Sequence, residues 1–238
     1  MNRALTLSIS PFADRIRPPL AVAAAVLLAL GLVLGMGFVP EDAAQRGSFR
    51  IAVIHYPAAW MSFVLYLAAA VVSIVTLARH ERAAAIVANA IAPTGILFTL
   101  IALWTEALWR KPLRGLWWAW DAEAVSQLML MFLFGGLVAL RAMIDDSRRA
   151  DRATALLALV GAANLPVLYF SIRWWDALQR APQVPVPAMR GALALATLLV
   201  GSGFAAYAVF AVLGRARCAV TEREVLARSM HELREARS

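Results

Sequence analysis

The residues best suited to chemistry gather in one segment, 105–121. It carries three cations and four tryptophans: Arg110, Lys111, Arg114, Trp109, Trp117, Trp118 and Trp120. Indole faces stack on flat conjugated rings, and cations pair with carboxylates at the edge of such a ring. The segment therefore suits a flat, apolar, anionic ligand. An amphipathic helix lying in a membrane interface has the same composition, and composition alone does not separate the two interpretations.

One histidine, His55, stands directly before the sequence Tyr56-Pro57-Ala58-Ala59-Trp60, where a long apolar stretch begins. Pro57 suits the first turn of a helix, so the imidazole is predicted at a membrane boundary. There it is either a hydrogen-bonded interface residue or a metal ligand. His80 follows 25 residues later, roughly 37 Å away along a helix, so the two histidines cannot share one iron.

Composition indicates that a membrane positions these residues. The chain has 238 residues, of which 62% are hydrophobic and 16% charged, against roughly 45–50% and 25% in soluble domains. The net charge of +8 comes without Lys/Arg-rich runs, so no nucleic acid is expected as a partner. The single cysteine, Cys218, excludes an internal disulfide, a CxxC redox pair and a CxxCH haem-attachment site.

Six stretches without Asp, Glu, Lys or Arg are long enough to cross a bilayer as helices: 18–40, 51–78, 83–105, 124–140, 153–172 and 191–214. They are rich in Ala and Leu and lack the alternating pattern of a membrane barrel. We predict an all-α, polytopic membrane protein of six transmembrane helices. The spans are set at about 19–39, 58–78, 83–104, 124–140, 153–172 and 191–213, within one membrane domain, 1–214, that precedes a tail, 215–238.

Six crossings put both termini on one side of the membrane. If that side is the cytoplasm, it holds fifteen of the 23 Lys and Arg residues: Arg3, Arg15, Arg17, Arg79, Arg82, Arg141, Arg148, Arg149, Arg152 and the six arginines of the tail. The positive-inside rule prefers this orientation. We therefore predict a multi-pass protein of the bacterial inner membrane with cytoplasmic termini and a periplasmic segment 105–121.

The tail is predicted to form a separate short amphipathic helix. Thr221 and Glu224 have the spacing of a capping box, and Leu226, Met230 and Leu233 follow at i, i+4 and i+7. Such a helix can dock on a soluble partner, lie on anionic lipid, or simply be a solvated helical end.

In this topology all eight tryptophans fall at the outer ends of spans or in outer loops: Trp60, Trp104, Trp109, Trp117, Trp118, Trp120, Trp174 and Trp175. Interfacial aromatic belts normally occupy both faces of a membrane. A belt explains Trp60 and Trp104, which sit where spans meet headgroups. It explains the cluster at 117–120 poorly, and this cluster favours a binding surface.

Three outer segments resemble the haem-handling membrane proteins of cytochrome c biogenesis, in particular the family of cytochrome c maturation protein C, also called haem exporter protein C. The matching segments are HYPAAWM at 55–61, GLWWAWDA at 115–122 and YFSIRWWDAL at 169–178. The WWxWD pattern at Trp117–Asp121 is specific in this context, and the similarity covers all six spans in order. The resemblance implies that a Trp-rich periplasmic surface, with Trp117, Trp118, Trp120 and Asp121, binds haem b, and that His55 is an axial ligand of its iron.

The chain departs from the family pattern at two positions. Gln179 stands where the family has its second histidine ligand, and an amide oxygen is a weak ligand of iron. Family members commonly carry Arg shortly after WWxWD, whereas Glu123 stands there in this chain. We hypothesise that Arg114, and Arg110 with it, takes over as the partner of a haem propionate. Asp121 has an equally good simple role as the cap of the fourth helix.

The resemblance implies a haem-binding subunit of a cytochrome c maturation complex that is not an enzyme. It would present haem at the periplasmic face to a membrane-anchored haem chaperone, which captures it covalently. Implied partners are the ABC-type ATPase and permease subunits and a small single-span subunit. Because the chain has no Walker motif, ATP hydrolysis belongs to a partner.

Two other functions stay open. One is an assembly or scaffold homologue that does not retain haem, which the missing histidine permits. The other is a quinone-linked membrane oxidoreductase or a transporter. The absence of Asp, Glu, Lys and Arg from the six spans speaks against the second, and the chain has no HExxH, GxSxG or P-loop motif that would indicate an enzyme.

Overall fold

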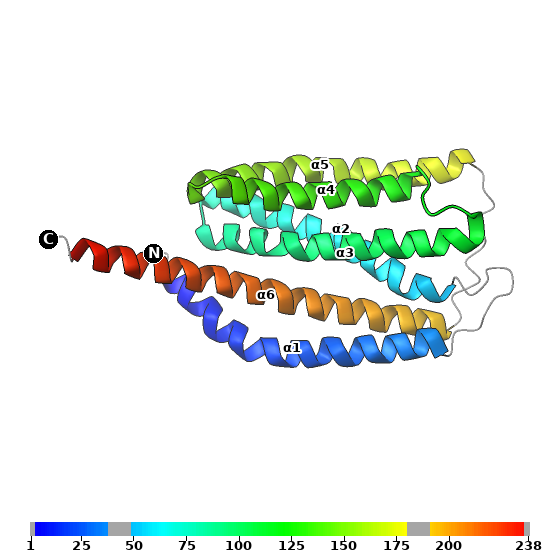
Figure 1. Cartoon of the computed structure of the whole chain (residues 1–238), viewed down its shortest axis with the longest axis horizontal. Coiled ribbons are helices and arrows are strands. Elements are labelled where there is room, and N and C mark those ends of the chain that lie inside the picture. The colour runs from blue at the N-terminus through cyan, green and yellow to red at the C-terminus, as the bar shows by residue number, and fades with distance from the viewer. Residues whose placement is uncertain (1–2, 38–48, 180–190, 236–238) are drawn as a thin grey trace.

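A computed structural model of the chain describes residues 3–37, 49–179 and 191–235. These residues form six helices: α1 (Arg3–Gly37), α2 (Phe49–Arg79), α3 (Arg82–Arg114), α4 (Ala122–Met143), α5 (Ser147–Gln179) and α6 (Gly191–Glu235). The helices run side by side in an elongated bundle, with α1 and α6 paired along one side (Figure 1). The prediction of an all-α fold is confirmed.

Five of the helices are long and apolar enough in their described residues to cross a membrane. The apolar segments are Asp14–Gly37, Arg50–Arg79, Arg82–Pro112, Ala122–Met143 and Gly191–Arg223. The chain is therefore a polytopic membrane protein. The remaining predicted span, 153–172, lies in α5, and part of it falls outside the residues whose side chains the structure describes.

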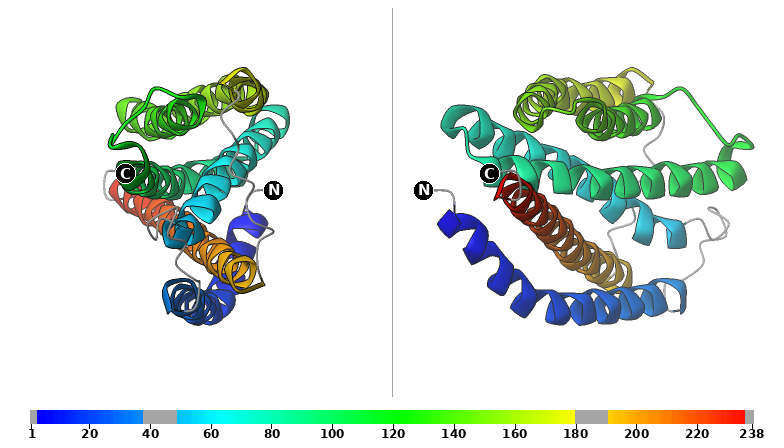
Figure 2. Two further views of the ribbon diagram at one scale, coloured as in Figure 1. Left: turned by 90° about the vertical axis from the view of Figure 1, so that its right-hand side faces the viewer. Right: turned by 60° about the vertical axis from the view of Figure 1, so that its left-hand side comes forward.

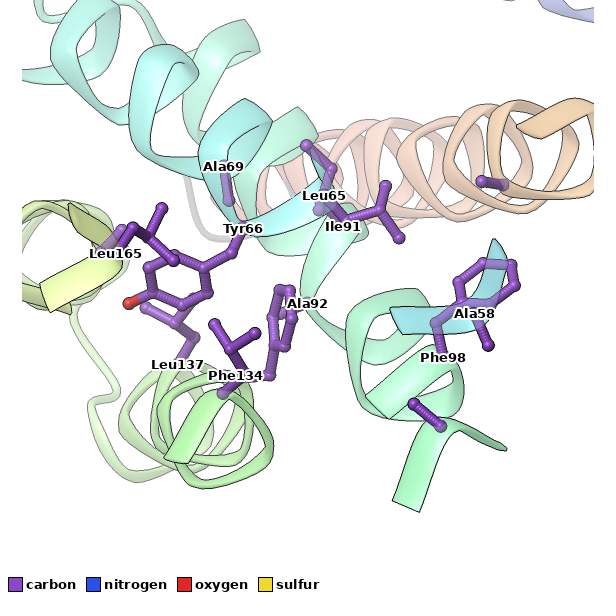
Figure 3. Close-up of a cluster of buried hydrophobic side chains, with 14 residues drawn as sticks. Ala58, Leu65, Tyr66, Ala69, Ile91, Ala92, Phe98, Phe134, Leu137 and Leu165 are labelled. Atoms are coloured by element: carbon purple, nitrogen blue, oxygen red, sulfur yellow. The ribbon is translucent and has the colours of Figure 1, made fainter. Parts of the chain in front are cut away.

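The buried core is built from alanines and aromatic rings contributed by different helices. Tyr66 of α2 meets Phe134 of α4 edge to face, with ring centroids 5.0 Å apart (Figure 3). Small residues allow this approach: a Cβ at Gly95 of α3 would lie 2.2 Å from the ring of Phe134, and one at Gly161 of α5 would lie 1.9 Å from the Tyr66 hydroxyl oxygen. Close packing at small residues is how membrane helices associate.

The helices extend beyond the predicted spans because a helix does not stop where its apolar stretch stops. α1 begins at Arg3, α2 at Phe49, and α3 continues to Arg114. One local prediction is wrong as a result, because Pro57 lies inside α2 rather than in its first turn, which membrane helices tolerate. Residues 106–114, which follow the predicted span 83–104, form the last turns of α3.

The tail does not form a separate helix, since α6 runs without a break from Gly191 to Glu235 (Figure 2). The hydroxyl of Thr221 donates to the carbonyl of Arg217, one turn earlier, at 3.2 Å, which is a contact within a helix and not a cap. The predicted capping box is therefore wrong. Arg223 lies 3.7 Å from the buried carboxylate of Asp151 in α5, so the extension of α6 is held against the bundle.

One end of the bundle carries the tryptophan segment. We call the end where α2 and α4 begin and α3 and α5 end the tryptophan end (Figure 1). There, Gly115 ends α3 in the left-handed conformation (φ 74°), and its N–H donates to the Lys111 carbonyl at 3.0 Å. Asp121 begins α4 by accepting a hydrogen bond from the N–H of Ala124 at 3.0 Å. The predicted capping role of Asp121 is confirmed, and the two caps fix a short loop, 115–121.

Candidate functional site

Three helices build a cavity at the tryptophan end. α2 contributes His55 and Tyr56, α3 contributes the side chains of its last turns, and the first turn of α4 contributes Glu123. The cavity has a volume of about 210 Å³ and is lined by His55, Tyr56, Glu106, Trp109, Arg110, Arg114 and Glu123. Residues far apart in sequence meet here because α2, α3 and α4 lie antiparallel to their chain neighbours.

His55 is buried, with 2% of its surface exposed, and both of its ring nitrogens have partners. Nδ1 lies 3.1 Å from the carbonyl oxygen of Ala102 and 3.1 Å from the hydroxyl oxygen of Thr105. The Thr105 hydroxyl donates its own hydrogen to carbonyls of α3. Nδ1 therefore faces two acceptors, and we assign it the hydrogen.

The other ring nitrogen, Nε2, lies 3.1 Å from Oε1 of Glu123. Metal-binding histidines commonly donate one ring N–H to a backbone carbonyl, which fixes the tautomer and the ring orientation. His55 has this anchor at Nδ1, so Nε2 is its one nitrogen placed to bind a ligand.

Two aromatic rings surround the imidazole. Tyr56 and Trp109 each meet it edge to face, at centroid distances of 5.6 and 5.9 Å, and they meet each other at 5.6 Å. These contacts hold the His55 ring in one orientation and restrict solvent around it. Trp109 is thus the tryptophan of segment 105–121 whose ring contacts His55.

A network of charged side chains forms the other wall. Arg110, which is buried, donates to Glu106 one turn earlier in α3 and also pairs with Asp121. Oε2 of Glu106 has no hydrogen-bond partner among the described residues. Partial burial disfavours the charged form of Asp121, but the hydrogen bonds from Arg110 and from the Ala124 N–H outweigh it and lower the pKa of Asp121. Arg110 therefore ties the loop to α3.

Arg114 is more exposed and more weakly paired than Arg110. Its side chain is 63% exposed and its guanidinium lies 3.9 Å from Asp121. A pair this long and exposed contributes little stability. Arg114 is thus the cation of the cavity wall that is able to turn toward an anionic ligand, whereas Arg110 is held by two carboxylates.

Loop 115–121 carries the remaining tryptophans of the segment. Trp117 is 54% exposed and Trp120 is 75% exposed. The ammonium of Lys111 lies 5.4 Å from the ring centroid of Trp117, and Trp118 meets Trp120 edge to face at 5.5 Å. None of the three loop tryptophans lines the cavity. Trp117 and Trp120 form an exposed aromatic surface beside it, and Trp118 is half-buried.

The structure thus brings part of the predicted site together. His55 and Arg114 line the cavity, and Asp121 is joined to its wall through Arg110. Gln179 is the last residue of α5, which ends at the same end of the bundle (Figure 1), and its side chain lies outside the described residues.

Two acidic residues of the site, Glu106 and Glu123, were not predicted from the sequence. Glu106 and Arg110 have the i, i+4 spacing of a helical ion pair. This signal becomes readable only when the helix is taken to continue beyond the predicted span 83–104. Glu123 was noted only as a departure from the family pattern, and no pattern in the sequence indicates that it reaches His55. That contact depends on how α4 packs against α2.

The site does not resemble a closed metal centre. No group of three or more His, Cys, Asp or Glu side chains able to hold a metal ion occurs among the described residues. Pockets that enclose a small ligand measure roughly 300–1,000 Å³, and this cavity is smaller, about 210 Å³. The cavity is therefore too small to enclose a large flat ligand.

Comparison with known proteins identifies the relatives of this chain. Residues 3–231 match a family described as heme exporter protein C. The chain is 42% identical over 180 residues to heme exporter protein C of Escherichia coli strain K12, covering 74% of each chain. It is 36% identical over 170 residues to heme exporter protein C of Haemophilus influenzae, covering 71% of this chain and 69% of that protein.

A more distant relative is a mitochondrial protein of Marchantia polymorpha whose description names cytochrome c biosynthesis. The identity is 32% over 158 residues, which covers 66% of this chain and 67% of that protein.

Proposed function

The chain belongs to the heme exporter protein C family, and we propose that it binds haem b as cargo at the tryptophan end, with His55 as the protein ligand of the iron. Membership makes it a membrane component of haem export and cytochrome c biogenesis. The function we propose is to present haem for transfer, not to catalyse a reaction.

The observation that carries this proposal is the orientation of His55. Its Nδ1 is anchored to the Ala102 carbonyl, and its Nε2 points into a cavity next to exposed indoles. Trp117 and Trp120 offer apolar faces for a porphyrin, and Arg114 offers a mobile cation for a propionate. Asp121 orders this surface by capping α4 and pairing with Arg110.

Holding cargo through one strong ligand suits delivery. The position of Gln179 supplies at most a weak amide oxygen, so iron bound by His55 keeps a face that another ligand can take. A haem that lies across an open rim is also accessible to a second protein. We infer that the recipient is a membrane-anchored periplasmic haem chaperone, which supplies its own ligand during transfer.

The proposed arrangement in the membrane follows from the basic residues. Both termini lie in the cytoplasm, α5 crosses the membrane as the fifth of six spans, and the tryptophan end faces the periplasm of the bacterial inner membrane. The partners in this proposal are the ABC-type ATPase and permease subunits and a small single-span subunit of the maturation complex.

A second candidate function is an assembly homologue that does not retain haem. Two observations favour it. The carboxylate of Glu123 lies within hydrogen-bond distance of Nε2 of His55, and Gln179 stands where the family has its second histidine.

Haem retention separates the two functions. The wild-type chain, His55→Ala and Gln179→His are purified with haem and examined by absorption spectroscopy and haem content. His80→Asn serves as the control, because His80 lies at the opposite end of α2 with φ 51°, a conformation that Asn tolerates. We expect haem to be lost only in His55→Ala and a stronger low-spin spectrum in Gln179→His. Equal retention in His55→Ala and wild type would exclude His55 as the ligand.

A further inference from the structure

We propose that Glu123 is a displaceable cap on His55: in the ligand-free protein its carboxylate covers Nε2, and it must rotate away before a ligand reaches that nitrogen. The inference rests on the proposed function, because it concerns the same histidine. It adds a residue that sets how tightly, and how reversibly, the site holds its cargo.

The carboxylate of Glu123 covers Nε2, which is the one ring nitrogen of His55 that faces the cavity. Nδ1 is directed at the Ala102 carbonyl and the Thr105 hydroxyl, inside the bundle. Nε2 faces the cavity, and there Oε1 of Glu123 lies 3.1 Å away. The side chain of His55 is only 3% exposed. A ligand atom cannot occupy the position of Oε1 while the carboxylate remains, so the contact and ligand binding exclude each other.

The cap is able to leave. Glu123 lies in the first turn of α4, its side chain is 47% exposed, and His55 is its one hydrogen-bond partner among the described residues. A rotation about its side-chain bonds moves the carboxylate into solvent without disturbing the backbone.

The other two acids near the cavity are fixed. Glu106 is 5% exposed and held by Arg110. Asp121 is held by the same arginine and by the N–H of Ala124. Glu123 is therefore the acid of this group that can open and close the site.

A cap of this kind weakens binding and eases release. Binding replaces the hydrogen bond between His55 and Glu123 with a bond from Nε2 to the ligand, and the hydrogen that the pair shares leaves with the carboxylate or to water. When cargo is transferred, the carboxylate returns to Nε2 and prevents immediate rebinding. A hydrogen bond to a charged group is worth enough to change affinity by about tenfold or more, which corresponds to about 1.4 kcal/mol.

The test uses the full chain in detergent with Glu123→Ala, Glu123→Gln and His55→Ala. Glu222→Ala is the control, since Glu222 is an exposed glutamate of α6 at the opposite end of the bundle. The first measurement needs no haem: diethyl pyrocarbonate modifies accessible imidazole nitrogens, and peptide mass spectrometry gives the rate at His55 with His80 as internal reference. The second is titration with haem, followed by absorption.

We expect Glu123→Ala to raise both the rate of His55 modification and the affinity for haem by about tenfold or more, with Glu123→Gln in between and Glu222→Ala unchanged. An unchanged modification rate at His55 in Glu123→Ala would overturn the cap, whatever the haem titration shows. Weaker haem binding in that variant would also overturn it, because Glu123 would then support the ligand. Faster modification without haem binding in any variant would uphold the cap and reject the proposed function.

Discussion

Replacing Asp121 should release loop 115–121, because this carboxylate makes both contacts that begin α4 and join the loop to α3. Asp121→Ala removes the cap on the Ala124 N–H and the pair with Arg110. Loss of a cap costs about 1 kcal/mol, and loss of a hydrogen bond to a buried charge costs about 1.5–3 kcal/mol. The side chain of Asp121 is 20% exposed, so solvent screens the pair only partly.

Asp121→Asn separates the two contributions. Asn is as good a cap as Asp, but it lacks the charge that pairs with Arg110. Relative to wild type, opening of the loop should therefore rise on the order of 10- to 10²-fold in Asp121→Asn and 10²- to 10³-fold in Asp121→Ala. Trypsin reports this opening by cleavage after Arg114, since the rate of proteolysis follows the population of the open state.

Asp146→Ala is the matched control. Asp146 accepts a hydrogen bond from the N–H of Arg148 at the start of α5, in a loop at the other end of the bundle. It should leave cleavage after Arg114 unchanged. If Asp121→Ala and Asp121→Asn were cleaved at the wild-type rate, the carboxylate would not hold the loop, and this account of the site's architecture would be refuted.

The remaining predictions concern the behaviour of Asp121 at low pH, the packing around Gly161, the ion pair of Asp151 with Arg223, and the role of Arg114. Because the folded-state pKa of Asp121 is lowered, the stability that its carboxylate contributes is present above its ordinary pKa of 3.8 and is lost as pH falls through the lowered value. Tryptophan fluorescence should show this acid transition in wild type and not in Asp121→Asn. Gly161→Ala should destabilise the bundle by about 1–3 kcal/mol in thermal unfolding, because the added Cβ would lie 1.9 Å from the Tyr66 hydroxyl oxygen, and a second change, Tyr66→Phe, should recover part of the loss. Asp151→Asn should raise tryptic cleavage after Arg223, which lies 3.7 Å from the carboxylate. Arg114→Glu should reduce haem retention, and unchanged retention would rule out this arginine as a propionate partner.

The number of helices was accessible from sequence because it depends on local patterns. Charge-free stretches locate the apolar cores of helices, and Asp121 was identified as the cap of α4 from its position. Helix ends were less accessible, because polar turns such as 106–114 extend α3 beyond its apolar stretch. The tail prediction failed for the same reason, since α6 continues through Thr221.

The contacts of His55 were inaccessible to sequence reasoning. Glu123 is separated from His55 by 68 residues, and their 3.1 Å contact exists only because α4 begins beside α2. The engagement of Arg110 by two carboxylates likewise required the folded loop. His55 and the tryptophan segment are each visible in the sequence, whereas the contacts between them are a property of helix packing.

Chemical rescue tests whether Nε2 of His55 is the protein atom that binds haem iron, as we propose. His55→Gly removes the imidazole and leaves a space at the cavity that free imidazole can enter. We expect this variant to lose the low-spin haem spectrum and added imidazole to restore it. A His55→Gly variant that keeps the wild-type haem spectrum without added imidazole would contradict the claim.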